Sequence, residues 1–251
     1  MTRAAYIATI VTEGARLAAV PADALDRPVP SCPDWSVGDL IGHVGRVHRW
    51  ATAHLAEAPD KPTAKRPAPP DGAAVLPWYR ESLDLLLAEL DRHEPDEPAH
   101  SFAGPVTVGF WARRQAHELA VHRWDAQDAV HPGDVEAIPA DLAADGVDEW
   151  LELFVPRFLA MRDEPIPAEL VGASLHLHGT DEDQTEPAEW LLRLTADGCE
   201  VERAHAKGDA ALRGPASDLL LAAWHRVPLD RLDVVGDAAR AQAVLDLVHV
   251  T

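Results

Sequence analysis

Cysteine is scarce in this chain of 251 residues, which contains only Cys32 and Cys199. Two cysteines cannot form the dense disulfide framework of small secreted proteins, which favours a reducing, cytoplasmic location. Long apolar runs are also missing, because no stretch approaches the roughly 20 residues that a membrane-spanning helix needs. Glu13 and Arg16 interrupt the apolar start of the chain, so we expect an amphipathic helix there and not a signal peptide.

Basic residues are few as well. The 22 lysines and arginines face 42 acidic residues, and the formal net charge is −20. Such a surface repels nucleic acids and anionic membranes, which makes both unlikely partners, although a small anion can still enter a locally basic pocket. The chain also lacks a dinucleotide-binding glycine motif, a P-loop, a Gly-x-Ser-x-Gly elbow and a Cys-x-x-Cys pair.

What the first part of the chain does contain is helical periodicity. Apolar residues recur every three or four positions in five segments, which predict helices over about 7–18, 37–55, 75–90, 108–129 and 140–160. Ser36 and Asp39 form a capping-box pattern at the start of the second helix, and we expect Pro156 to kink the fifth. The segments rich in proline and polar residues between these helices predict loops over 21–35, 58–72 and 93–105.

The pattern changes near residue 165. Apolar and polar residues alternate over 174–178, 190–195 and 199–203, and a fourth short strand is expected over 210–213. Two helices follow, from Pro215 to about 224 and from about 237 to 248. The fold class is therefore a helical N-terminal domain (1–165), built on a four-helix bundle, followed by a small α+β domain (166–251).

The predicted helix 108–129 carries the most informative chemistry. On a helical wheel, Glu118 and His122 lie one turn apart within the apolar arc, whereas Arg114, His117 and Arg123 lie mostly outside it. A bare carboxylate inside a bundle costs several kcal/mol unless it is compensated. A divalent cation held by the Glu-x-x-x-His pair compensates it, and a simple hydrogen bond between the two side chains is the alternative.

One helix supplies two ligands, so a third must come from elsewhere. On the second helix His43, His48 and His54 all border the apolar face. His43 and His54 are roughly 16 Å apart along the helix axis and cannot share one ion. Helical geometry does not choose among the three. Six further histidines are interpreted as surface or structural residues: His117, His131, His176, His178, His205 and His225.

Two runs of sequence resemble the mycothiol-dependent maleylpyruvate isomerase family. Ser31-Cys-Pro-Asp-Trp-Ser-Val-Gly-Asp-Leu-Ile-Gly-His43 is similar to its N-terminal signature. His117-Glu-Leu-Ala-Val-His-Arg-Trp-Asp125 is similar to its second, a Glu-x-x-x-His-x-x-Asp pattern. The order and separation of the two runs agree with the family, and the resemblance covers essentially the whole chain. It implies a DinB-like four-helix metal domain followed by the family's α+β domain.

The resemblance also implies a site and a chemistry. It implies His43, Glu118 and His122 as ligands of a divalent metal, usually zinc, with an open coordination position of the catalytic kind. It further implies mycothiol, the actinobacterial thiol, as cosubstrate, and an isomerase or S-transferase that acts on a small electrophile. Arg213 and Arg226 are candidates to bind a dicarboxylate substrate, and we assign Arg226 a catalytic role. A non-catalytic metal-binding or regulatory module is the alternative function.

Overall fold

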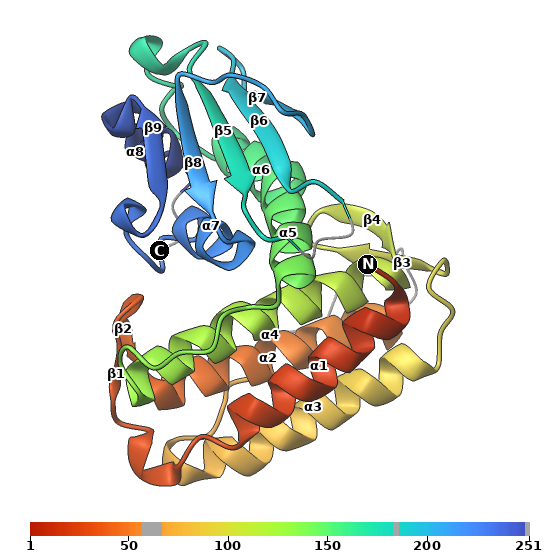
Figure 1. The fold of residues 1–251 in the computed structure, drawn as a ribbon. Helices are drawn as coiled ribbons and strands as arrows, with labels where there is room; N and C mark the ends of the chain where they lie inside the picture. The colour runs from red at the N-terminus through yellow and green to blue at the C-terminus, as the bar shows by residue number, and fades with distance from the viewer. Residues whose placement is uncertain (57–66, 183–185, 249–251) are drawn as a thin grey trace. The chain divides into compact units, whose positions relative to one another are not determined.

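The computed structural model describes residues 1–56, 67–182 and 186–248 (Figure 1). Residues 57–66, which include the first part of the expected proline-rich loop 58–72, lie outside the described residues. The chain divides into two compact units, Met1–Glu136 and Ala137–Thr251. Among the residues that the structure describes, no helix is both long and apolar enough to cross a membrane.

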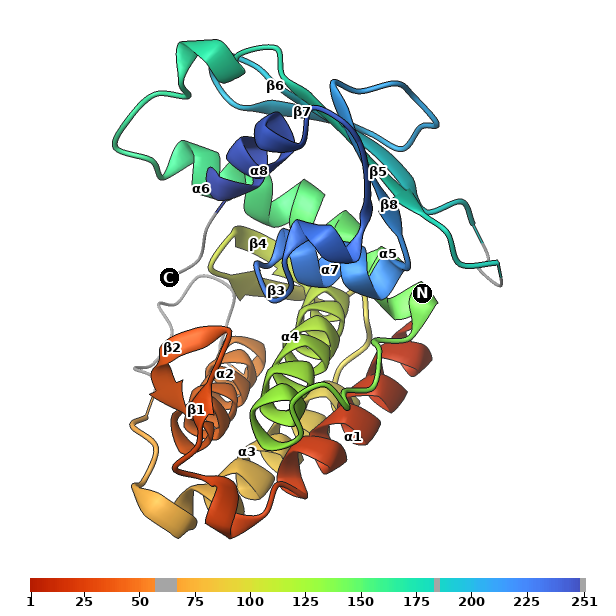
Figure 2. The ribbon, with the colours of Figure 1, turned by 60° about the vertical axis from the view of Figure 1, so that its left-hand side comes forward.

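The first unit contains four long helices that lie side by side (Figures 1 and 2). They are α1 (Arg3–Ala18), α2 (Val37–Ala56), α3 (Val75–Asp91) and α4 (Val108–Val130). Helix α2 packs against α3 and α4, and α1 packs against α4. These are the four helices that the periodicity predicts, with ends that agree to within a few residues.

Helix α4 is buried on more of its circumference than the helical wheel predicts. Arg114, His117 and Arg123, which we expected mostly outside the inward face, are all buried, and Arg123 is only 1 % exposed. The reason is that α4 contacts α1 on one side and α2 on the other. The Arg123 Nε donates to Glu13 Oε2 of α1 at 2.5 Å, so the buried charge has a buried partner.

The start of α2 is fixed by the predicted capping box. The Ser36 backbone N–H and hydroxyl both donate to Asp39 Oδ2, at 2.9 and 2.6 Å, and the Asp39 N–H donates back to Ser36 Oγ at 3.1 Å. These bonds satisfy backbone groups that have no partner within the helix. They also set the position of every side chain along α2.

Two short hairpins replace expected loops in this unit. Strands β1 (Pro28–Val29) and β2 (Cys32–Ser36) pair within the segment 21–35, and β3 (Pro98–Ser101) pairs with β4 (Gly104–Thr107) around 93–105. The strands are short and contain prolines, so they show little of the alternation by which longer strands are recognised. Single turns of 3₁₀-helix lie at Ala22–Ala24 and Gly72–Ala74.

The second unit is built on a five-stranded sheet. Its strands are β5 (Ser174–Gly179), β6 (Glu189–Leu194), β7 (Cys199–Glu202), β8 (Ala210–Gly214) and β9 (Asp233–Gly236). The spatial order is β7-β6-β5-β8-β9, in which only the β5–β8 pair is parallel. The four predicted strands are present, and β9 is an additional edge strand that the sequence pattern did not predict.

The helices of this unit lie on one face of the sheet (Figures 1 and 2). They are α5 (Ala140–Glu149), α6 (Val155–Ala160), α7 (Ala216–Ala223) and α8 (Ala238–Asp246), with 3₁₀ turns at Ala168–Leu170 and Leu229–Arg231. A π-helical turn, Trp150–Phe154, joins α5 to α6. It ends just before Pro156, whose missing N–H removes an α-helical hydrogen bond at the place where we expected a kink.

The two units divide earlier than the predicted boundary at residue 165. Helix α5, which the sequence analysis assigned to the helical domain, packs on α7 of the second unit. On α5, Asp148 accepts hydrogen bonds from the Trp190 indole at 2.6 Å and from the Arg203 guanidinium at 2.7 and 2.9 Å. These contacts explain why the segment after Glu136 belongs with the sheet.

Apolar side chains and histidines alternate along β5 and so lie on opposite faces of the sheet. Leu175 and Leu177 are at most 1 % exposed and face the helices, whereas His176 and His178 point to the opposite face. Strand β6 contributes buried Trp190, and Glu189 lies opposite His178. The sheet therefore has an apolar core on one face and a group of histidines on the other.

Candidate metal centre

Helices α2 and α4 bring the three predicted ligands together. His43 lies on the second turn of α2, and Glu118 and His122 lie one turn apart on α4. The Nε2 atom of His43 is 3.1 Å from Glu118 Oε1, and the Nε2 atom of His122 is 3.4 Å from the same oxygen. One donor atom from each residue lies within 4.8 Å of the other two.

The other nitrogen of His122 is held by a carboxylate. Its Nδ1 is 2.9 Å from Oδ2 of Asp125, which is fully buried. The hydroxyl of Ser31, in the turn of the first hairpin, donates to Asp125 Oδ1 at 2.6 Å. When Nδ1 carries the proton, Nε2 is free to act as a ligand, as in the carboxylate–histidine pairs around metal ions. Asp125 thus fixes both the tautomer and the orientation of the ring.

Arg114 holds the second oxygen of Glu118. Its guanidinium donates to Oε2 at 2.6 Å from one turn earlier on α4. This ion pair lowers the cost of placing a carboxylate inside the bundle. It also fixes the rotation of the carboxylate, so that Oε1 faces the two imidazoles.

Trp35 covers one side of the cluster. Its ring centroid is 4.7 Å from that of His43 and 6.3 Å from that of His122. The three candidate ligand side chains keep exposures of 21 % for His43, 14 % for Glu118 and 9 % for His122. The cluster is therefore partly enclosed, and each of the three side chains keeps some exposure to solvent within the described part of this unit.

The electrostatics of the cluster follow from burial and these pairs. Burial lowers the pKa of His43 more than Glu118 raises it, which favours the neutral imidazole. Burial by itself also lowers the pKa of His122, but hydrogen bonds to Asp125 and Glu118 outweigh it and raise the pKa to about 9. Burial would raise the pKa of Glu118, yet the two histidines and Arg114 hold it well below its usual range.

The donor set fits a zinc-like ion. Ligand atoms at 2.0–2.1 Å from a tetrahedral ion are roughly 3.3 Å apart, and the two nitrogen–oxygen separations around Glu118 Oε1 are 3.1 and 3.4 Å. Two imidazoles and one carboxylate leave a fourth position for a water or substrate, as in catalytic zinc sites. An ion would have to displace the proton that lies between His122 and Glu118 when the metal is absent.

His48 and His54, the alternatives to His43 as the third ligand, lie away from the cluster. His48 is fully buried, and its Nδ1 is 2.6 Å from Gln115 Oε1, while burial lowers its pKa to about 4. His54 packs among aromatic rings, 5.0 Å from Trp50 and 5.1 Å from Trp111 between ring centroids. Neither belongs to the cluster, so the structure brings only His43 of the three to Glu118.

The predicted arginines belong to the second unit. Arg226 follows α7, donates to the carbonyl of Trp224 at 2.7 Å, and lines a cavity of about 300 Å³ with His225 and Gln242. Arg213 lies on β8 and pairs with Asp233 at 3.4 Å. Arg226 therefore lies beside a cavity, and its catalytic role stays a prediction.

Sequence reasoning missed the residues that support the ligands. The helical wheel predicts Arg114 mostly outside the inward face, and the sequence pattern predicts a loop around Ser31. Asp125 could have been found from the sequence, because it occupies the last position of the Glu-x-x-x-His-x-x-Asp pattern. A position three residues after His122 on the same helix is the spacing that lets a carboxylate reach the ring.

Together the fold and the cluster define a class of two-unit protein, in which a helical unit with a histidine–carboxylate centre precedes a small α+β unit. The sequence profile of the mycothiol maleylpyruvate isomerase N-terminal domain matches residues 7–127, and that of the MDMPI C-terminal domain, named for the same isomerase, matches residues 141–243. The chain belongs to the mycothiol-dependent maleylpyruvate isomerase family. The two matches divide at the same place as the two compact units.

Solved structures agree with this fold. The chain is similar to the crystal structure of the mycothiol-dependent maleylpyruvate isomerase and to that of a histidine-to-alanine mutant of it. Each comparison gives a TM-score of 0.62 and 13 % identity, and covers 95 % of both chains. At this identity the likeness concerns the fold. No curated protein matches the chain in sequence.

We expect Glu118→Gln and His43→Ala each to lose the zinc equivalent bound at this cluster, because each substitution removes one of its three ligands. Glu118→Gln does so while nearly preserving the shape of the side chain. His48→Ala and His54→Ala, matched changes on the same helix as His43, should keep the wild-type metal content. Elemental analysis after dialysis against a weak chelator measures all four. If His54→Ala loses metal and His43→Ala retains it, the assignment of the third ligand is wrong. Wild-type protein that holds well under one equivalent would contradict the site itself.

Asp125→Asn should weaken zinc binding by about 10- to 100-fold, because the buried carboxylate that orients His122 loses its charge. Asp128→Asn is the matched control, since Asp128 is only partly buried on the same helix and contacts none of the three ligands in the described structure. Competition with a chromophoric chelator measures both affinities. Equal affinities for the two variants would show that Asp125 does not position the ligand.

Proposed function

We propose that this chain is a metal-dependent enzyme that uses mycothiol to isomerise a small electrophilic substrate. The observation that carries the proposal is the cluster of His43, Glu118 and His122, whose donor atoms converge and remain partly exposed. Membership of the isomerase family supports the thiol and the reaction class. A zinc ion is the metal that the donor set favours, and an S-transferase that uses the same thiol is the closest alternative reaction.

The residues around the cluster have separable roles. When bound, a zinc ion would supply a Lewis acid that lowers the pKa of a thiol and favours the thiolate. Asp125 keeps the proton of His122 on Nδ1, and Arg114 holds Glu118 Oε2, so both ligands are oriented before any substrate arrives. Trp35 shields His43 from water on one side.

The isomerisation itself needs no net consumption of thiol. The thiolate sulfur forms a bond to one carbon of an activated cis double bond, and the electron pair moves into the conjugated carbonyl. Rotation about the resulting single bond and expulsion of the same thiolate restore the double bond in the trans form. In an S-transferase the carbon–sulfur bond persists and the thiol is used up.

A non-catalytic metal-binding module is the weaker alternative. Such a module would be expected to enclose its ion with protein ligands. Here three candidate ligands leave a fourth position, and His43 is 21 % exposed. This arrangement favours an enzyme.

We expect zinc-loaded protein to convert maleylpyruvate to its trans isomer with mycothiol in substoichiometric amounts. Total thiol, titrated before and after the reaction, should stay constant because each turnover regenerates it. Glu118→Gln should lose nearly all activity, whereas His131→Ala, an exposed histidine outside the cluster, should keep it. Falling thiol with product formation would favour the S-transferase. No turnover of maleylpyruvate or of a bimane electrophile, together with no mycothiol binding by calorimetry, would contradict the thiol-dependent function.

Arg226 is proposed to bind a substrate carboxylate. Arg226→Ala should raise KM for a dicarboxylate on the order of 10- to 100-fold, because a charge-assisted hydrogen bond contributes about 1.5–3 kcal/mol. Metal content should not change. Arg226→Lys keeps the charge but not the planar fork, so we expect an intermediate KM. Steady-state kinetics of both variants that equal the wild type would contradict a role for Arg226 in binding the substrate.

A further inference from the structure

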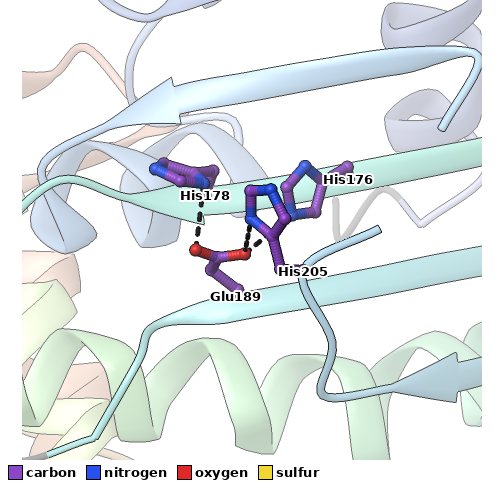
Figure 3. Close-up of side chains that lie close together, drawn as sticks. All are labelled: His176, His178, Glu189 and His205. Carbon is purple, nitrogen blue, oxygen red and sulfur yellow. Dashed lines mark hydrogen bonds and ion pairs between the residues drawn. The ribbon is translucent and has the colours of Figure 1, made fainter. Parts of the chain in front are cut away.

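A second group of possible metal ligands lies on the face of the sheet away from the helices. His176 and His178 come from β5, Glu189 comes from the start of β6, and His205 comes from the segment 203–209 that joins β7 to β8 (Figure 3). From the sequence, all three histidines are expected to be surface or structural residues. One donor atom from each of the four residues lies within 4.8 Å of the others.

The four side chains converge on the Glu189 carboxylate. His178 Nδ1 is 3.3 Å from Oε1, while His205 Nδ1 and His176 Nε2 are 2.5 and 3.5 Å from Oε2 (Figure 3). The three imidazole centroids are 5.6, 5.6 and 5.9 Å apart, and the rings meet edge to face. The rings are therefore not stacked on one another, and one donor atom from each lies close to those of the others.

His176 shows that hydrogen bonds alone do not satisfy this group. Only 6 % of the residue is exposed, yet among the described residues its buried Nε2 makes no well-formed hydrogen bond, although Glu189 Oε2 lies 3.5 Å away. A buried polar atom without a good partner destabilises the folded state. The nitrogen points into the cluster, where an ion bound by His178, Glu189 and His205 would give it a partner.

The segment that carries His205 is held at both ends. Arg203 makes two hydrogen bonds to Asp148, at 2.9 and 2.7 Å. At the other end, Asp209 accepts from the Ser174 N–H at 2.8 Å and donates its own N–H to the Ser174 carbonyl at 2.9 Å. His205 is thus kept over β5 although it is 79 % exposed.

Gly208 brings this segment close to β5. A Cβ atom at residue 208 would lie 3.0 Å from both the His176 N and the Ser174 O, which only glycine avoids. The backbone of the segment therefore packs directly on the strand that supplies two of the four side chains.

The donor chemistry selects the kind of ion. Three imidazoles and one carboxylate suit zinc and its late first-row neighbours, whereas magnesium and calcium take oxygen ligands. Arg213, opposite His178 on β8, is paired with Asp233 at 3.4 Å. Within the described residues, Arg213 therefore does not pair with Glu189, whose carboxylate contacts the three histidines.

We propose that His176, His178, Glu189 and His205 form a second binding site for a late first-row divalent ion such as Zn²⁺. Four protein ligands make it a closed site of the structural kind. The ion cross-links β5, β6 and the 203–209 segment, and so stabilises the second unit by linkage. This site is independent of the centre on α2 and α4.

The test compares zinc content across matched variants of the full chain. Metal-free protein is incubated with excess Zn²⁺, passed through gel filtration, and analysed for zinc per chain. His178→Ala and His205→Ala should each bind one equivalent fewer than His131→Ala, an exposed histidine outside both groups. Because His205 is highly exposed, its removal should leave the circular dichroism spectrum unchanged. Equal zinc content in His205→Ala, His178→Ala and His131→Ala would overturn the proposal.

A second measurement separates this site from the first centre. Glu118→Gln protein, which lacks a ligand of the helical centre, should still bind one equivalent, and Zn²⁺ should slow amide hydrogen exchange in residues 203–209. His205→Ala introduced into Glu118→Gln should abolish both effects. If Zn²⁺ leaves exchange in 203–209 unchanged, the second site does not exist, whatever the result for the helical centre.

Discussion

The structure of the first unit depends on one largely enclosed anion, the carboxylate of Glu118. Arg114 holds one of its oxygens, and His43 and His122 approach the other. Removing any partner from a buried charge is costly, on the order of 3–5 kcal/mol. Helices α2 and α4 are therefore fixed in axial position and in rotation, and Asp125 extends the same network to the first hairpin.

The elements that could be predicted are those with local signals. The four long helices follow from apolar periodicity, and the start of α2 follows from Ser36 and Asp39, because a capping box involves only four residues. The third ligand could not be derived in this way. A helical wheel gives the face of His43, His48 and His54, but only the packing of α2 on α4 decides which one reaches Glu118. The family motif carried that information.

The group of histidines on the sheet could not be predicted from the sequence either, because it also depends on tertiary structure. The His-x-His pattern at 176 and 178 places both rings on one face, and that much is local. Glu189 reaches them through the pairing register of β5 and β6, and His205 through the path of a connecting segment. The end of the first unit was also misplaced, because α5 looks like any amphipathic helix until its partner α7 is known.

The order of strands in the sheet has a consequence for how the chain is made. Of the five strands of this sheet, β5 is the first to leave the ribosome, yet it lies at the centre of the sheet. The meander β5-β6-β7 can form from neighbouring segments as soon as they emerge, whereas β8 must pair in parallel with β5 across more than thirty intervening residues. Until β8 arrives, one edge of β5 is exposed to other chains, so synthesis of this unit passes through a stage prone to aggregation.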